Sequence, residues 1–497
     1  MRSHTTRLLV RNVAHLAIGQ VVTTSLAVLL TAVIGRALEP AQLGILYTVL
    51  AISSFVFVIV EWGQGTYLVR EMARGRVDEP ELIGSALLMR LAAIAVSSMV
   101  AVAIALAMGY GGEVVWFTLL AVVAGIPGLL SVPFGCSFRS RDRMDIDAFA
   151  TSVGRAITLI ATFLALRFGG GLAEVILMGG VGGFASLLVV IVAASRLDIA
   201  VKAPVTKALR ELFRHGAPLT AFSLVLASQS FLDILLLSVL AGPTVVGWFG
   251  AFRSIFGILT SPAMILLGAT FPALSRASRS LPDFQRMIDA TGRIMFIAAA
   301  STSSAIYLFA DDMVAIVFGH GRFEQTASIL RVSAIFIPLL FFVMILASAM
   351  NALGRNKEMA VISIVRVTFC AAMNWLIIGY WQQRFGNGAI ALFIIAGLAE
   401  IPATIACIAL LPKGAVGLAT TINFVRAYIA SLCTVVPLSM LQPIGLVYLA
   451  PLFVLVFALT AMVTRLVTSS DLRLAMELVR GRVIAPQEAK SGPTLDG

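Results

Sequence analysis

The stretch LIGSALLMRLAAIAVSSMVAVAIALAM, residues 82–108, decides the fold class of this chain. Arg90 is its only charged residue. About 20 apolar residues in a helix, rising 1.5 Å each, cross a hydrocarbon core about 30 Å thick. Lipid offers no partner for a free backbone N–H or C=O group, so such a run must be helical. The stretch predicts a membrane-spanning helix.

Similar runs follow one another along all 497 residues, of which 59% are hydrophobic and 12% are charged. A soluble protein carries roughly twice that share of charge. The first run is too long for a signal-peptide core and lacks a small-residue cleavage site, so we expect it to be retained. The sequence therefore predicts an all-α polytopic membrane protein with about 14 transmembrane helices. The predicted spans are 13–37, 43–69, 82–108, 114–137, 148–167, 172–195, 217–241, 244–273, 292–309, 327–353, 358–381, 389–411, 421–441 and 444–466.

Basic residues are distributed very unequally between the two sets of connections. Of the 36 Lys and Arg residues, 26 lie in the termini and the even-numbered connections, and five lie on the opposite side. The positive-inside rule then places both termini in the cytoplasm. Because this bias accounts for the net charge of +11, the charge does not indicate a nucleic-acid partner.

Three polar connections have an amphipathic pattern. In Pro204–His215, apolar residues occupy one helical face and basic residues the other. Leu281–Ile288 has a weaker version, and a third follows Ser470. We expect these segments to be helices at the surface of an anionic leaflet.

Two motifs occur twice, six predicted helices apart. The motif P-x-x-x-G occurs at 40–44 and 243–247, and R-F-G-x-G occurs at 167–171 and 384–388. Their order predicts two six-helix lobes related by a parallel pseudo-two-fold repeat, with two additional C-terminal helices. Parallel repeats are a transporter architecture. The predicted divisions are 1–198, 199–415 with a cytoplasmic surface helix, 416–468 for the two additional helices, and 469–497 for a cytoplasmic tail.

Several arginines lie inside predicted spans, where a charge is costly unless it meets water, a partner or a ligand. Arg426 is close to a helix end and is expected to snorkel. The deeper arginines are Arg90, Arg155, Arg253 and Arg366. Helical spacing groups them with polar residues into stripes: Thr151, Arg155, Thr158 and Thr162; Ser363, Arg366, Cys370 and Asn374; Arg253 and Thr260; and Gln20, Thr24 and Thr31 in the first span.

Two interpretations of these stripes remain open. They line a hydrated, cation-rich cavity between the lobes, or each arginine pairs with a carboxylate that holds the helices together. The available carboxylates are Glu61, Asp233 and Glu400. Asp233 and Glu400 are also candidates to bind a coupling Na⁺ or H⁺.

Other kinds of site are not indicated. The four cysteines lie in separate predicted helices without a C-x-x-C pair, and the four histidines lack metal-ligand spacing. The sequence GGVGG at 179–183 lacks the Lys and Ser/Thr of a phosphate-binding loop, and close helix packing explains it better. No nucleophile–base combination appears. We therefore predict no enzyme activity, no metal and no cofactor other than a coupling ion.

Particular segments resemble the bacterial polysaccharide transporters, which are the O-antigen and exopolysaccharide flippases of the multidrug/oligosaccharidyl-lipid/polysaccharide (MOP) exporter superfamily. The resemblance extends from Arg11 to about Pro412. The segments that carry it are Ile34-Gly35-Arg36-Ala37-Leu38-Glu39-Pro40 with Gly44; Trp62-Gly63; Arg70-Glu71-Met72-Ala73-Arg74; Asp233 with Pro243, Gly247 and Phe249; Val317-Phe318-Gly319 with Phe323; and Ala352-Leu353-Gly354-Arg355-Asn356-Lys357 with Asn374.

The resemblance implies a flippase of the bacterial inner membrane. Such proteins move undecaprenyl-diphosphate-linked oligosaccharide from the cytoplasmic to the periplasmic leaflet by alternating access. Arg253 occupies the place of a functional arginine in relatives. The implied partners are the lipid-linked oligosaccharide, membrane lipids, polysaccharide polymerase and glycosyltransferases. The alternatives are a lipid II-type flippase, a multidrug exporter of the same superfamily and a non-transporting membrane scaffold.

Overall fold

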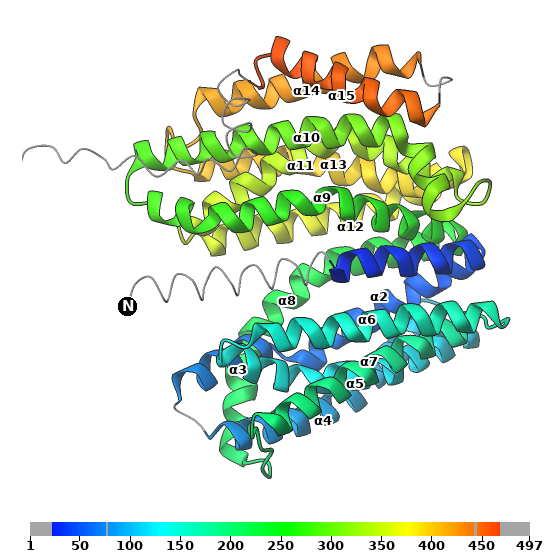
Figure 1. Ribbon diagram of the computed structural model, residues 1–497, viewed down its shortest axis with the longest axis vertical. Coiled ribbons are helices and arrows are strands. Elements are labelled where there is room, and N and C mark those ends of the chain that lie inside the picture. Colours follow the sequence, from blue (N-terminus) through cyan, green and yellow to red (C-terminus); the bar gives the residue numbers. More distant parts are fainter. Residues whose placement is uncertain (1–21, 76–77, 442–444, 468–497) are drawn as a thin grey trace, which may run out of the picture. The chain divides into compact units, whose positions relative to one another are not determined.

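A computed structural model describes residues 22–75, 78–441 and 445–467 (Figure 1). Every regular element in these ranges is a helix, and thirteen stretches are long and apolar enough to cross a membrane. Val22–Ala37 adds a shorter apolar helix. The prediction of an all-α polytopic membrane protein is confirmed. The helices are α2 (Pro40–Glu61), α3 (Gln64–Arg74), α4 (Glu79–Ala107), α5 (Gly112–Ser140), α6 (Met144–Arg167), α7 (Leu172–Arg196), α8 (Thr206–Ala241), α9 (Pro243–Ala277), α10 (Leu281–Phe318), α11 (Glu324–Ala352), α12 (Asn356–Phe385), α13 (Gly388–Leu410), α14 (Leu418–Ser439) and α15 (Leu446–Val463).

The predicted span 43–69 is not one uninterrupted helix. It is broken at Trp62 and Gly63, which have left-handed φ angles of 46° and 60° and separate α2 from α3. Glycine adopts this conformation without strain. The tryptophan is held by α8, since its Nε1 donates to the Phe213 carbonyl at 3.0 Å and the two rings stack. Tertiary contacts with α8 therefore fix the break.

The two described segments with the amphipathic pattern are not separate helices. Residues 206–215 form the first turns of α8, and 281–288 those of α10. Their position at an anionic leaflet remains a prediction. Leu212 is fully buried and packs with Tyr67 of α3 and Leu82 of α4. Part of the apolar stripe is thus covered by protein. The helix predicted after Ser470 lies outside the described residues, as does the first part of span 13–37.

The chain divides into two compact units. The first comprises 1–262, 309–333 and 356–406, and the second comprises 263–308, 334–355 and 407–497. In the second unit, Ser431 of α14 lies 3.2 Å from the Ser303 hydroxyl and 3.0 Å from that of Ser304, both on α10. These hydroxyl contacts attach α14 to the unit. Every described residue of the candidate site belongs to the first unit.

The repeated P-x-x-x-G motifs contact each other reciprocally inside the first unit. A Cβ added to Gly44 would lie 1.7 Å from the carbonyl oxygen of Pro243, and one added to Gly247 would lie 1.9 Å from that of Pro40. Glycine lets the first turns of α2 and α9 approach this closely. The exchange of equivalent contacts is what a two-fold relation requires. The repeat of two whole lobes remains a prediction.

The second repeated motif forms similar turns at two places. Gly169 and Gly386 follow the ends of α6 and α12, with φ angles of 86° and 74°. Both positions need a residue that tolerates positive φ. Each glycine redirects the chain into the next helix, α7 or α13.

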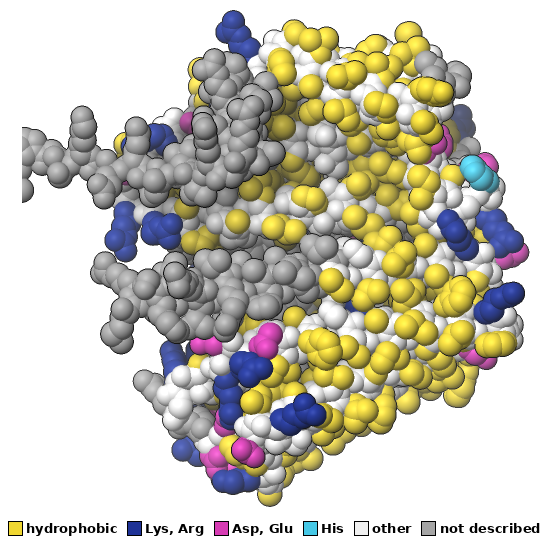
Figure 2. All heavy atoms as spheres, in the orientation of Figure 1, with side chains coloured by type: hydrophobic (Ala, Val, Ile, Leu, Met, Phe, Trp, Pro, Cys, Tyr) yellow, Lys and Arg dark blue, Asp and Glu magenta, His cyan; other side chains and the backbone are white. Residues whose placement is uncertain are grey.

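The helix surfaces match a lipid environment. Figure 2 shows hydrophobic side chains over most of the visible described surface and charged side chains mainly toward the helix ends. Exposed apolar residues include Met99, Phe163 and Leu459. An aqueous environment does not account for this surface, whereas acyl chains do.

Candidate substrate-binding site

Arg253 of α9 faces a half-open pocket of about 330 Å³ between α2, α8 and α9. Its Nη2 donates to the Ser230 hydroxyl at 3.4 Å, and its Cζ lies 6.0 Å from the centre of the Phe249 ring. No carboxylate among the described residues forms an ion pair with Arg253. The pocket therefore offers a guanidinium with unused donors. The other lining residues used below are Tyr47, Ser54, Phe55 and Phe231.

Aromatic rings and hydroxyls make up much of the remaining lining. Phe55 and Phe231 stack with centroids 4.3 Å apart and ring planes 13° apart. The Tyr47 hydroxyl lies 3.0 Å from that of Ser254. Flat apolar faces beside hydroxyls suit a ligand with both C–H and O–H groups.

Arg366 is held in a network of three helices. Its Nη1 donates to Glu400 of α13 at 2.7 Å, and its Nη2 donates to the side-chain oxygen of Gln229 of α8 at 2.6 Å. The side chains of Arg366 and Glu400 are 21% and 11% exposed. For Arg366, the pairing interpretation is therefore correct in this structure. The second carboxylate oxygen of Glu400 is buried without a hydrogen-bond partner among the described residues.

Asp233 lies one helical turn beyond Gln229, on the same side of α8. The amide nitrogen of Asn374, from α12, donates to the Asp233 carboxylate at 3.5 Å. Asn374 is 1% exposed, and its own amide oxygen has no hydrogen-bond partner in the described part of the chain. Gln229, one turn before Asp233, binds Arg366, and Ser230 binds Arg253. The carboxylate thus lies within one helical turn of the side chains that bind both arginines.

The polar stripe predicted on α12 is real. Arg366 and Asn374 reach α8, and Cys370 between them is buried. On α8, Gln229 and Asp233 meet α12 while Ser230 lines the Arg253 pocket. This helix therefore connects the paired arginine with the unpaired one.

Arg90 is in a different environment. It is fully buried, and its Nε donates to the side-chain oxygen of Gln64 at 2.9 Å. Its Nη1 donates at 2.8 Å to the carbonyl of Leu129 in α5. Pro133, four residues further on, has no N–H to offer that carbonyl. Arg90 thus stabilises the start of α3 and a proline-interrupted turn of α5.

The stripe predicted on α6 divides into two parts. Arg155 and Thr151 are exposed, and Arg155 has no hydrogen bond or ion pair with any other described residue. Thr158 bonds the Gly154 carbonyl and packs on Gly182 of α7, and Thr162 is fully buried. The structure does not bring Arg155 into the Arg253 pocket. Thr158 supports the packing of α6 on α7.

Two further candidates complete the set. Glu61 is exposed at the end of α2, where the helix breaks. Gln20 lies outside the described residues. Glu61 does not line the Arg253 pocket.

Sequence reasoning missed Gln229, Ser230 and the residues that α2 contributes to the pocket. A signal was present, because Ser228-Gln229-Ser230 interrupts an apolar helix one turn before Asp233. Tyr47 and Ser54 are separated by two helical turns and share a face of α2. The sequence shows the helical spacing of these polar residues. Only the structure shows that α2 lies against α8 and α9 at the pocket.

Buried and half-open polar sites lie within the apolar helices of a multi-pass membrane protein. The fold resembles that of the lipid II flippase MurJ in an inward closed conformation, with a TM-score of 0.70, 11% identity, and coverage of 93% of this chain and 99% of that one. An inward-facing MATE-family multidrug resistance transporter of the MOP superfamily gives a TM-score of 0.65 at 16% identity, covering 79% and 96%. A MATE-family multidrug resistance transporter of the MOP superfamily in an outward-facing conformation gives a TM-score of 0.53 at 15% identity. That match covers 84% of this chain and 96% of the transporter.

The family model described as "Polysaccharide biosynthesis protein" matches residues 9–278. This is more than half of the chain, which belongs to that family. The structural matches share the MOP-superfamily fold, as the resemblance implied. A search of curated proteins finds no match.

Proposed function

We propose that this protein is a flippase that moves undecaprenyl-diphosphate-linked oligosaccharide from the cytoplasmic to the periplasmic leaflet by alternating access. It acts in the bacterial inner membrane, with both termini in the cytoplasm, alongside glycosyltransferases and a polysaccharide polymerase. The observation that carries the proposal is Arg253, an unpaired guanidinium in a half-open pocket. Membership of the polysaccharide biosynthesis family supports the substrate class.

The chemistry of the pocket suits each end of such a substrate. A diphosphate is anionic, and an arginine can donate two parallel hydrogen bonds to phosphate oxygens. The hydroxyls of Tyr47, Ser54 and Ser230 match sugar hydroxyls, and the stacked pair Phe55 and Phe231 offers an apolar face to the sugar C–H groups. The polyprenyl chain remains in the bilayer.

The sign of the pocket's charge argues against a multidrug exporter for organic cations. Its lining includes an arginine and no carboxylate among the described residues. A scaffold has no need of an unpaired cation in a half-open pocket. The lipid II-type alternative shares the diphosphate chemistry, and the MurJ fold is compatible with it. The family match favours a polysaccharide precursor over lipid II.

We also propose that the polar network beside the pocket couples transport to a cation. Neighbouring helices contribute three oxygen ligands for a cation. They are the Asp233 carboxylate, the amide oxygen of Asn374 and the second carboxylate oxygen of Glu400, and the last two have no hydrogen-bond partner among the described residues. Na⁺ or H⁺ at Asp233 would reduce the attraction between that carboxylate and Arg253, leaving the arginine available to the diphosphate. Asp233→Asn is expected to retain substrate binding and to lose the dependence of transport on the ion gradient.

The test of the flippase proposal substitutes Arg253. Arg253→Ala removes charge and forked geometry together, so we expect export to stop. Arg253→Lys keeps the charge and is expected to retain partial activity. Arg384→Ala, which removes an exposed charge at the end of α12, is the control. The measurements are surface polysaccharide and the amount of protein in the membrane.

Each outcome has a defined meaning. Normal accumulation of Arg253→Ala with lost export supports the proposal. Normal export by this variant refutes a role for Arg253 in binding diphosphate. Absence of the variant from the membrane assigns Arg253 to folding instead. A purified protein that moves fluorescent organic cations, but not lipid-linked glycan, in vesicles identifies the multidrug alternative.

A further inference from the structure

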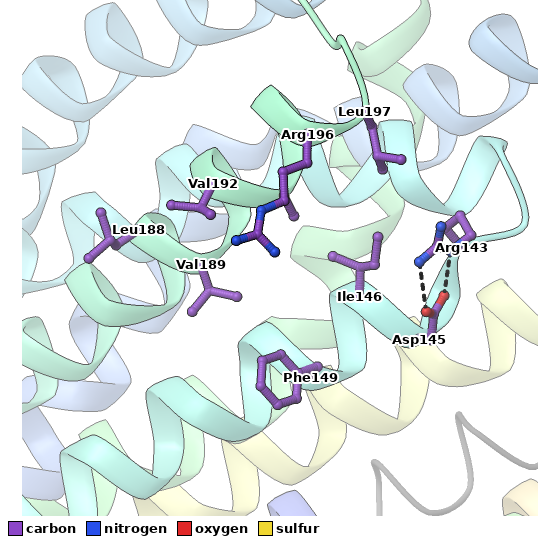
Figure 3. Close-up of a pocket in the computed structure, with 10 residues that line it drawn as sticks. Arg143, Asp145, Ile146, Phe149, Leu188, Val189, Val192, Arg196 and Leu197 are labelled. Atoms are coloured by element: carbon purple, nitrogen blue, oxygen red, sulfur yellow. Dashed lines mark hydrogen bonds and ion pairs between the residues drawn. The ribbon is translucent and has the colours of Figure 1, made fainter.

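A second pocket lies away from the Arg253 site, on the surface between α6 and α7. It is half-open, has a volume of about 740 Å³ and is lined by residues from those two helices and Arg143 before α6 (Figure 3). Phe149 of α6 and Leu188 and Val192 of α7 form apolar walls and are 62%, 53% and 43% exposed. The apolar walls are therefore exposed to the acyl chains of a surrounding bilayer.

One end of this groove carries an unneutralised cation. Arg196 is the last residue of α7, and Figure 3 shows its side chain extending over the groove near Val189 and Ile146. It makes no hydrogen bond or ion pair with any other residue that the structure describes. The C-terminal end of a helix favours a basic residue in general. That effect explains the presence of Arg196 but leaves its five N–H donors without a partner in the described part of the chain.

Two acidic residues at the start of α6 are already paired with other arginines. Asp145 accepts two hydrogen bonds from Arg143, at 3.0 and 3.1 Å. This hydrogen bonding raises the pKa of Arg143. Asp147 is paired with Arg139 at 2.8 Å.

The remaining arginine of the loop before α6 is also paired. Arg141 binds Glu79 at 2.7 Å. Every arginine of this loop therefore has an acidic partner, and Arg196 does not. An anion supplied from outside the described chain would complete the site.

We propose that the α6–α7 groove binds an anionic glycerophospholipid of the surrounding bilayer. The phosphodiester accepts hydrogen bonds from Arg196, and one acyl chain lies along Leu188, Val192 and Phe149. The groove is on the end of the helices where the basic connections gather, which is where anionic head groups attract arginine. The pocket shares no lining residue with that of Arg253, so this inference does not depend on the proposed function.

The test uses the full-length protein purified in a neutral detergent. Native mass spectrometry compares the fraction bound to phosphatidylglycerol with that bound to phosphatidylcholine, which has no net charge. We expect Arg196→Gln to lower phosphatidylglycerol affinity about fivefold, the contribution of one basic side chain near anionic lipid. Arg196→Lys should lower the affinity for phosphatidylglycerol by a smaller factor. Arg167→Gln removes an exposed charge from the other end of α6 and should behave as wild type.

A second variant tests the acyl-chain part of the groove. Val192→Trp fills the apolar wall and should reduce binding of both lipids without changing the protein's unfolding temperature. Equal binding of both lipids by the wild type, or equal behaviour of Arg196→Gln and Arg167→Gln, overturns the proposal. If soluble glycerol phosphate competes with bound phosphatidylglycerol as strongly as free lipid does, the groove recognises only a phosphate group and the lipid proposal is wrong. Displacement by undecaprenyl diphosphate that depends on Arg196 assigns the groove to the substrate path instead.

Discussion

Arg90 and Arg253 are the same residue type within membrane-spanning helices, yet their surroundings differ in almost every respect. Arg90 is fully buried, and its guanidinium bonds an amide oxygen and a backbone carbonyl. Arg253 is exposed to a half-open pocket and bonds one serine hydroxyl at 3.4 Å. The first satisfies groups of the protein itself, whereas the second retains donors for a ligand.

The contrast shows that depth in the membrane does not define the role of an arginine. A charge at that depth must be compensated, but backbone oxygens compensate it as well as a substrate does. Arg366 lies between the two cases, because Glu400 and Gln229 hold it while Asp233 lies nearby. The decisive property is whether the unused guanidinium donors face an open pocket, since Arg90 Nη2 also has no hydrogen-bond partner among the described residues but is buried.

The sharpest test of the comparison is Arg90→Ala. It leaves Gln64 and the Leu129 carbonyl without a donor inside the bundle, and we expect a loss of roughly 3 kcal/mol in folding free energy. The protein should largely disappear from the membrane fraction, whereas Arg253→Ala should accumulate normally. Quantitative immunoblotting of both variants measures this. An Arg90→Ala protein that accumulates fully but does not export would place Arg90 in the substrate path.

The pair Arg366 and Glu400 gives the next largest expected effect. Arg366→Ala leaves the Glu400 carboxylate without an ion-pair partner among the described residues in a largely buried site, at a cost of about 2 kcal/mol. Adding Glu400→Gln removes that charge, so the double variant should regain most of the lost stability. Unfolding temperatures in detergent, with Glu400→Gln alone as the control, measure the coupling. Equal unfolding temperatures for the single and double variants would exclude a stabilising ion pair.

An effect of similar size is expected where α2 meets α9. Gly247→Ala places a methyl group against the Pro40 carbonyl, and overpacking of this kind costs about 1–3 kcal/mol. Gly257→Ala is the matched control on the same helix, since no neighbouring atom lies within 4 Å of its added Cβ. That control should be neutral or slightly stabilising. Equal unfolding temperatures for the two variants would show that the glycine contact is not maintained in the membrane.

The smallest effect on stability is expected for Arg155→Gln. The side chain is exposed and has no partner among the described residues, so the change should be within about 0.5 kcal/mol. Export should fall less than in Arg253→Gln, because Arg155 does not line that pocket. Surface polysaccharide normalised to protein level provides the comparison. A loss of export equal to that of Arg253→Gln would show that α6 contributes directly to substrate binding.

Much of the fold followed from local properties of the chain. Apolar runs predicted the membrane-spanning helices, and most described helices correspond to those runs, although 43–69 is divided and α15 is shorter than the predicted span 444–466. The repeated P-x-x-x-G motif indicated equivalent helix starts, which Pro40 and Pro243 provide. Hydrophobicity and helix initiation act over a few residues, so a sequence displays them directly.

The partners of the intramembrane charges were decided only by the tertiary structure. Helical spacing placed Arg366 and Asn374 on one face, but it did not show that α8 supplies Gln229 and Asp233 opposite them. Nor did it distinguish Arg90, which takes the carbonyl released by Pro133, from Arg253, which keeps free donors. The physical reason is that the cost of a charge in a membrane depends on acceptors contributed by other helices, and their distances arise only when the helices pack.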